Sequence, residues 1–192
     1  KMGFDLYGLN PKLKGVQPSI DWATATDEDK DRYVKARNIF EQENPGHYFR
    51  NNVWWWRPLA YLIEDKCKDF LTDEQRKSLH YNDGKEYSDK VAVKIANRLQ
   101  EVLDSGELEE LKKRHDAEMQ KAKEHNDILE SKIKVIQDAH KGIAPKDFPK
   151  EEYTNWKALQ EQKNWASSYP FEIDNVKEFI LFARCSGGFS IC

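Results

Sequence analysis

The side chains best suited to recognising a ligand are concentrated in one stretch of the chain, residues 44–59. Three consecutive tryptophans, Trp54, Trp55 and Trp56, offer flat rings that can stack on an aromatic ligand and indole N–H groups that can donate hydrogen bonds. Arg50 and Arg57 bracket them, and a guanidinium group can pair with two oxygens of a phosphate or carboxylate. This combination predicts a pocket for an anionic aromatic ligand such as a nucleotide.

Polar side chains near this stretch would complete the pocket. The amides of Asn51 and Asn52 can recognise the hydrogen-bonding edge of a base or a ribose, and His47 is a candidate acid or base beside them. Asp5 and Tyr7 would form a second wall if the two ends of the chain pair in a sheet, because they alternate with apolar neighbours. The ligand-binding residues predicted from the sequence are Asp5, Tyr7, His47, Tyr48, Arg50, Asn51, Asn52, Trp54, Trp55, Trp56 and Arg57.

Each of these groups also has an ordinary structural interpretation. Three successive residues cannot share one face of a helix or a strand, so at least one of the three tryptophans must serve a different purpose from its neighbours. The tryptophans would then be core residues, or the centre of a protein interface. The arginines would form salt bridges with some of the 34 acidic residues, and Asn52 would cap a helix. The sequence leaves these alternatives open.

The chain shows no recognisable pattern for metal binding or covalent catalysis. Its five histidines lack an HExxH or similar spacing, and its three cysteines lack a CxxC pair. We therefore expect no metal, no cofactor and no catalytic residue. The enzymatic alternative is a nucleotide hydrolase that uses Asp5, His47 or Glu64, although these residues form no acid–base pair of recognisable spacing.

Composition limits the classes of partner. The 192 residues include 31 basic and 34 acidic side chains, for a formal net charge of −3, so we expect no nucleic-acid partner held by a basic surface. No apolar run approaches the roughly 20 residues that span a bilayer, so we expect no membrane association. An odd number of cysteines without a secretory signal favours the cytoplasm. The length fits a single domain, residues 1–192.

Two segments at opposite ends of the chain have the alternation typical of strands. Residues 2–10 place the apolar side chains of Phe4 and Leu6 between polar neighbours, and residues 188–192 repeat this pattern around Ser190. A lone strand cannot satisfy its own backbone groups, so each needs a partner. We predict that the two chain termini pair in a small sheet.

A helix is expected after the tryptophans, and Pro58 decides where it begins. An interior proline removes a hydrogen bond and clashes with the preceding turn, whereas the first helical position tolerates it. We therefore predict that the helix begins close to Arg57 and leaves residues 54–56 in extended or turn backbone. The alternative is a helix that begins near Val53 and kinks at Pro58.

Two further helices form a predicted arm. Residues 88–104 carry one apolar face, and residues 107–140 carry a narrow seam at steps of three and four, which is typical of a hairpin or coiled coil. The break at Ser105-Gly106 is short enough for the two helices to fold back as a hairpin over residues 88–141. About half of the seam of the longer helix would then have to pack on the body or on a second copy of the chain. We therefore expect a homodimer that forms through this helix.

The predicted fold class is therefore mainly α: a helical body, a long antiparallel helical hairpin or coiled-coil arm, and a small sheet that pairs the chain termini.

Three segments together resemble a group of small, uncharacterised proteins from phage and bacterial genomes. They are MGFDLYG at residues 2–8, YFRNNVWWWRP at residues 48–58 and SGGFSIC at residues 186–192. The middle helices lie outside the resemblance. It implies a phage accessory protein in the host cytoplasm and names no activity.

These observations predict a non-enzymatic small-molecule-binding protein of phage type. Its pocket, at residues 48–57, would take an anionic aromatic ligand, for example a nucleotide signal that an anti-defence protein sequesters. The first alternative is a protein–protein inhibitor or adaptor that docks through the long helix. The second is the nucleotide-processing hydrolase.

Overall fold

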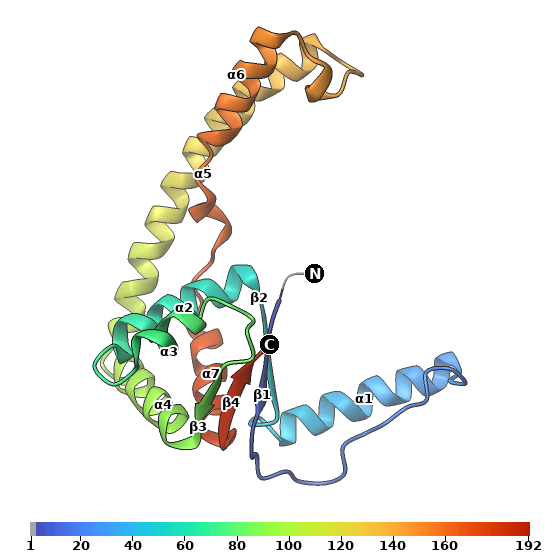
Figure 1. Cartoon of the computed structure of the whole chain (residues 1–192), viewed down its shortest axis with the longest axis vertical. Helices are drawn as coiled ribbons and strands as arrows, with labels where there is room; N and C mark the ends of the chain where they lie inside the picture. Colours follow the sequence, from blue (N-terminus) through green and yellow to red (C-terminus); the bar gives the residue numbers. More distant parts are fainter. Residues whose placement is uncertain (1–2) are drawn as a thin grey trace. The chain divides into compact units, whose positions relative to one another are not determined.

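The computed structural model describes residues 3–192. Within that range the chain is mainly helical, with seven α-helices and a four-stranded antiparallel sheet. It divides into two compact units, the first made of residues 3–109 and 172–192 and the second of residues 110–171. The first unit contains the sheet and the second contains most of the longest helix (Figure 1).

The sheet pairs the two ends of the chain, as predicted. β1 (Gly3–Gly8) and β4 (Gly188–Ile191) are antiparallel neighbours at its centre. Two strands that the sequence analysis did not predict flank them, β2 (Tyr48–Asn52) beside β1 and β3 (Glu86–Ser88) beside β4. The strand order is therefore β2-β1-β4-β3.

Three helices cover one face of this sheet. They are α2 (Val53–Cys67), α4 (Asp89–Asp104) and α7 (Ile173–Cys185), which pack against the strands and against each other. The apolar residues of each strand alternate toward them and form the core. The buried strand residues are Phe4, Leu6, Phe49, Tyr87, Phe189 and Ile191.

The helix after the tryptophans begins earlier than predicted. α2 contains all three tryptophans and has Pro58 inside it, so the predicted start beside Pro58 is wrong. Asn52 caps the helix: its Oδ1 accepts hydrogen bonds from the backbone N–H groups of Trp54 and Trp55, each at 3.0 Å. Because Pro58 lies close to the helix start, it removes only the bond that its own nitrogen would give to the Trp54 carbonyl.

A buried amide on α7 also supports the first turn of α2. Asn175 Nδ2 donates to the Trp55 carbonyl oxygen at 3.4 Å, and Asn175 Oδ1 accepts from Asn51 Nδ2 at 2.9 Å. Both asparagines are buried. The pair joins β2, the start of α2 and α7. These tertiary contacts therefore offset part of the free energy that Pro58 costs the helix.

Two further helices follow local signals closely. Thr26 caps α1 (Asp27–Glu43) and Thr72 caps α3 (Asp73–Ser78), each in a capping box. Phe40 is the buried residue of α1, and its ring packs edge-on against that of His47 at 5.3 Å. The C-terminal end of α1 is therefore anchored beside the start of β2.

Close backbone contacts join the segments that begin and end the sheet. A Cβ atom on Gly8 would lie 2.0 Å from the carbonyl oxygen of Gly46, and one on Gly46 would lie 2.1 Å from that of Cys185. Gly187 has a φ of 62°, and a Cβ atom on it would lie 2.3 Å from the carbonyl oxygen of Asn10. Only glycine fits at these positions. Without side chains there, β1, the turn before β2 and the end of α7 pack with their backbones in close contact.

The second unit is an antiparallel helical hairpin. One side is α5 (Glu107–Ala139), and the other is α6 (Lys150–Glu161) with the short 3₁₀ turns η1 (Pro145–Asp147) and η2 (Trp165–Ser168) (Figure 1). The contacts run in reverse order along the chain, as a hairpin requires. From the tip inward they include His140 with Glu152, Glu130 with Lys163, Asn126 with Asn164, His115 with Tyr169, and Lys112 with Phe171.

These contacts correct the predicted partner of the long helix. The seam of α5, which buries Ala122, Leu129 and Ile133, faces the returning segment 144–171 in this unit. The predicted partner, α4, packs in the first unit against α7, the sheet and α2. A narrow seam shows that a helix needs a partner, but it does not identify that partner.

Candidate functional site

The face of the sheet opposite the helices carries four of the predicted site residues. The strand register pairs Asp5 with Arg50 and Tyr7 with Tyr48. Residues directly opposite each other in an antiparallel pair project from the same face, and the intervening Leu6 and Phe49 project into the core. We call Asp5, Tyr7, Tyr48 and Arg50 the sheet-face cluster.

Asp5 holds the cluster together. The Tyr48 hydroxyl donates a hydrogen bond to Asp5 Oδ1, and Arg50 Nε lies 3.3 Å from the same oxygen. The rings of Tyr7 and Tyr48 lie side by side, with centroids 5.2 Å apart and planes tilted by 40°. One carboxylate therefore orients both an aromatic ring and a guanidinium group.

The cluster combines a neutral hydroxyl with a cation that has donors to spare. Partial burial, and then the hydrogen bond to Asp5, raise the pKa of Tyr48 well above its ordinary value, so this phenol keeps its proton. The Arg50 side chain is 53% exposed, and its contact with Asp5 runs through Nε. Its two terminal nitrogens can bind an anion without breaking that contact.

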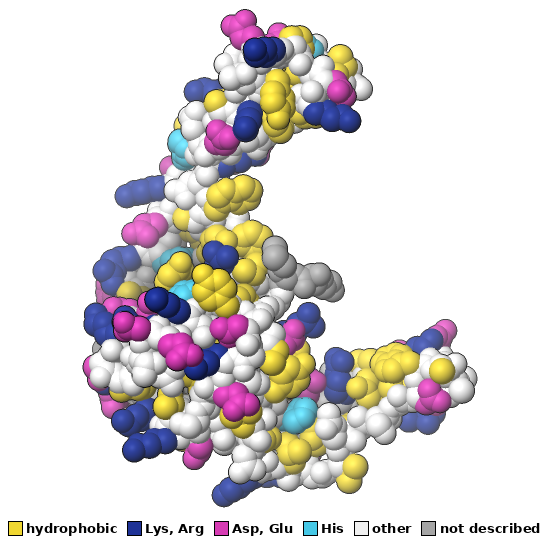
Figure 2. All heavy atoms as spheres, in the orientation of Figure 1, with side chains coloured by type: hydrophobic (Ala, Val, Ile, Leu, Met, Phe, Trp, Pro, Cys, Tyr) yellow, Lys and Arg dark blue, Asp and Glu magenta, His cyan; other side chains and the backbone are white. Residues whose placement is uncertain are grey.

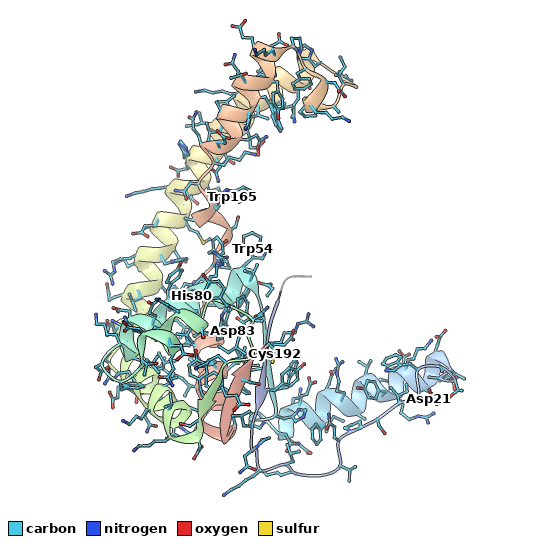
Figure 3. All side chains as sticks on the ribbon, in the orientation of Figure 1. Asp21, Trp54, His80, Asp83, Trp165 and Cys192 are labelled. Carbon is cyan, nitrogen blue, oxygen red and sulfur yellow. The ribbon has the colours of Figure 1, made fainter. Side chains whose placement is uncertain are left out.

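The three tryptophans have different environments. Trp56 is fully buried, stacks on Phe4 with centroids 5.5 Å apart, and donates from Nε1 to the Leu79 carbonyl oxygen at 2.7 Å. Trp54 and Trp55 are 39% and 40% exposed on the first turn of α2 (Figure 3 labels Trp54). Trp56 is a core residue, and its two neighbours remain partly accessible.

The other predicted site residues are dispersed. Asn51 is buried against Asn175, and Asn52 is the N-cap of α2. His47 packs on α1 at the opposite end of β2 from Asn52, and Arg57 is an exposed residue of α2. The structure thus brings four predicted residues into one cluster and gives the remaining seven different positions.

The same sheet face carries three residues that the site prediction missed. Ser190 lies opposite Tyr7 and Glu86 lies opposite Ser190. Cys192, labelled in Figure 3, exchanges two backbone hydrogen bonds with Asp5, at 3.1 and 2.8 Å. The alternation around Ser190 could have placed it beside Tyr7. Glu86 belongs to a three-residue strand, which is too short for a recognisable pattern.

No family model, curated protein or solved structure matches this chain. Within residues 3–192, no helix combines the length and the apolar character needed to cross a bilayer. The described residues also contain no group of three or more histidine, cysteine or acidic side chains placed to hold a metal ion.

The three residues of the hydrolase alternative have separate partners. Asp5 pairs with Tyr48 and Arg50, and His47 packs against Phe40. The Glu64 carboxylate lies 2.9 Å from the Nε2 atom of His80.

A cavity lies outside the cluster, between α1 and the loop that precedes it. Its volume is about 340 Å³. Figure 2 shows hydrophobic side chains at the surface over α1 and this loop, and the exposed ones include Leu13, Val16 and Trp22. None of the predicted site residues lines the cavity; its lining includes Pro18, Ile20, Asp21, Asp29, Arg32 and Tyr33.

Proposed function

We propose that the protein is a non-enzymatic binding protein whose ligand lies on the sheet-face cluster. The observation that carries this proposal is the pairing of Tyr7 with Tyr48 beside a half-exposed Arg50, on the face opposite the helices. Aromatic rings, a half-exposed guanidinium group and a fixed carboxylate on one surface suit a planar anionic ligand.

A nucleotide fits this chemistry. Its base would stack on the Tyr7–Tyr48 pair, because base–aromatic stacking tolerates any base with a flat ring. Its phosphate would accept hydrogen bonds from the terminal nitrogens of Arg50. The Asp5 carboxylate would repel a phosphate placed directly above it, so the phosphate is expected on the far side of the guanidinium group.

The setting follows the resemblance of residues 2–8, 48–58 and 186–192 to small proteins from phage and bacterial genomes. It supports a protein that sequesters a nucleotide signal in the cytoplasm of an infected host. Sequestration of a ligand needs affinity for it and no chemical reaction.

Thermal unfolding with a nucleotide panel tests the proposal. A ligand that binds only the folded state stabilises it by about 2.7 kcal/mol when present at 100 times its Kd. We expect at least one nucleotide to raise the Tm of the wild-type protein, and we expect Tyr7→Ala and Arg50→Ala to remove that increase.

Arg32→Ala is the matched control, because Arg32 is an exposed arginine on α1, away from the cluster. The variant should keep the full ligand-induced increase in Tm. A panel that shifts no Tm, or a shift that Arg32→Ala removes and Arg50→Ala preserves, contradicts the proposal.

A second candidate function is protein binding through α5. Ile128 and Val135 are 59% and 70% exposed and lie seven residues apart, so they form a stripe on one side of the helix. The buried Leu129 and Ile133 lie on a different side, against the returning segment. An adaptor or inhibitor would bind its partner protein through this second apolar stripe.

Crosslinking in host extract separates this candidate from ligand binding. If α5 docks on a protein, Val135→Glu should abolish the crosslinked species and Lys132→Glu, an exposed neighbour, should preserve it. Equal crosslinking by both variants would rule out the apolar stripe as the docking surface.

A further inference from the structure

The outer edge of β2 has unpaired backbone groups. The Gly8 N–H donates to the His47 carbonyl oxygen at 3.0 Å, so the inward-facing groups of this strand belong to residues 47, 49 and 51. The backbone N–H groups of Tyr48 and Arg50 consequently point away from β1. Because β2 is the last strand of the sheet on this side, they point toward a free edge (Figure 1).

Few features of the first unit protect this edge. Among residues 3–192, no group accepts a hydrogen bond from the outward N–H of Tyr48 or Arg50, and the Arg50 carbonyl accepts one from Asn51 Nδ2 at 2.9 Å. The main packing partners of β2 are β1, α2 and α7. Proteins commonly block such edges with proline, charged side chains or a bulge; YFRNN has no proline and no bulge, and Arg50 is its one charged residue.

We propose that a second copy of this chain pairs antiparallel with β2 across this edge. Tyr48 of one copy would lie opposite Arg50 of the partner subunit, and the reverse pair would form across the two-fold axis. Each pair exchanges two backbone hydrogen bonds, so four bonds satisfy the outward groups of Tyr48 and Arg50 in both copies.

Charge favours this register over the one in which Arg50 lies opposite its own counterpart. If Arg50 lay opposite its own counterpart, two guanidinium groups would meet directly, which is destabilising. The Tyr48–Arg50 register avoids that repulsion and brings each cation beside a ring. The strand is thus complementary to itself in this arrangement, which favours a second copy over an unrelated strand.

The pairing would change the binding surface. Neighbouring strands lie about 4.8 Å apart, so the two sheet-face clusters would adjoin on one continuous eight-stranded face. Such a face suits a ligand with two bases or several phosphates, such as a dinucleotide. This consequence rests on the proposed function, whereas the pairing itself does not.

Two variants at one position test the pairing. Arg50→Pro removes the outward N–H without removing a bond to β1, and edge strands tolerate proline at such positions. Arg50→Ala removes the guanidinium group and keeps the N–H. We expect the wild-type protein and Arg50→Ala to have twice the monomer mass by light scattering, and Arg50→Pro to have the monomer mass with an unchanged far-UV spectrum.

Amide hydrogen exchange of the wild-type protein provides a test that needs no variant. The N–H groups of Tyr48 and Arg50 should be protected at high protein concentration and should exchange fast on dilution, while that of Phe49 stays protected at both. A monomeric wild-type protein, or a dimeric Arg50→Pro, overturns the inference. A monomer whose Tm still responds to nucleotides would leave the proposed function intact, so the two failures are distinguishable.

Discussion

Replacing Trp56 and Trp55 by phenylalanine tests whether neighbouring tryptophans have different roles. Trp56 is fully buried and its indole donates to the Leu79 carbonyl oxygen at 2.7 Å, whereas Trp55 is 40% exposed. Trp56→Phe leaves that carbonyl, on a fully buried residue, without its donor, which costs about 1–3 kcal/mol. The smaller ring also leaves a void of at least methyl size, which costs about 1 kcal/mol more.

We therefore expect Trp56→Phe to lower the free energy of unfolding by about 2–4 kcal/mol. Trp55→Phe, the matched control, should change it by no more than about 0.5 kcal/mol, because surface substitutions seldom do more. Chemical denaturation followed by far-UV circular dichroism measures both values and avoids a signal that depends on the replaced indole. Similar losses for the two variants would refute the assignment of Trp56 to the core and Trp55 to the surface.

Three further predictions concern other parts of the fold. Burial raises the pKa of Cys67 to about 12, so at pH 8 this thiol should react with a thiol reagent far more slowly than the two exposed cysteines; three equal rates would contradict its burial. Asn51→Ala and Asn175→Ala should each destabilise by about 1–3 kcal/mol and be non-additive in a double-mutant cycle; simple additivity would disprove the buried amide pair. Asn126→Ala, which removes a side chain that both donates to and accepts from the returning segment, should increase proteolysis within residues 142–171; unchanged cleavage would show that this contact does not hold the hairpin.

Local signals in the sequence account for much of the secondary structure. Thr26 and Thr72 cap the first turns of α1 and α3, and Ser88 is the N-cap position of α4 although its side chain forms no capping bond. The alternation at both ends of the chain correctly predicted that β1 pairs with β4. Each of these features depends on a few neighbouring residues, or on the rule that a strand needs a partner.

The start of α2 was mispredicted because the cap at Asn52 and a tertiary contact outweighed the positional preference of Pro58. Pro58 alone favours a helix that begins beside it. Asn52 instead caps the helix, five residues before the start predicted at Arg57. Asn175, more than one hundred residues away in sequence, donates a hydrogen bond to the first turn of α2. No local pattern contains that contact.

Only part of the candidate site was predicted, because its other half depends on a strand pairing that no local pattern shows. Asp5 and Tyr7 were expected to face away from the core, and they do so. The tryptophan stretch drew attention to Tyr48 and Arg50 without showing that residues 48–52 form a strand. Once β2 exists, its register with β1 places these side chains beside Asp5 and Tyr7, whereas Trp56 belongs to the following helix and turns into the core.

The most direct test of the proposed function is a ¹H–¹⁵N NMR titration with the nucleotide that gives the largest Tm increase. We predict that the largest amide shifts fall on Tyr7, Tyr48, Arg50 and Ser190, the side chains of which share one face of the sheet. Shifts confined to α1, to the α5–α6 hairpin or to no residue at all would contradict the assignment of the ligand to this face.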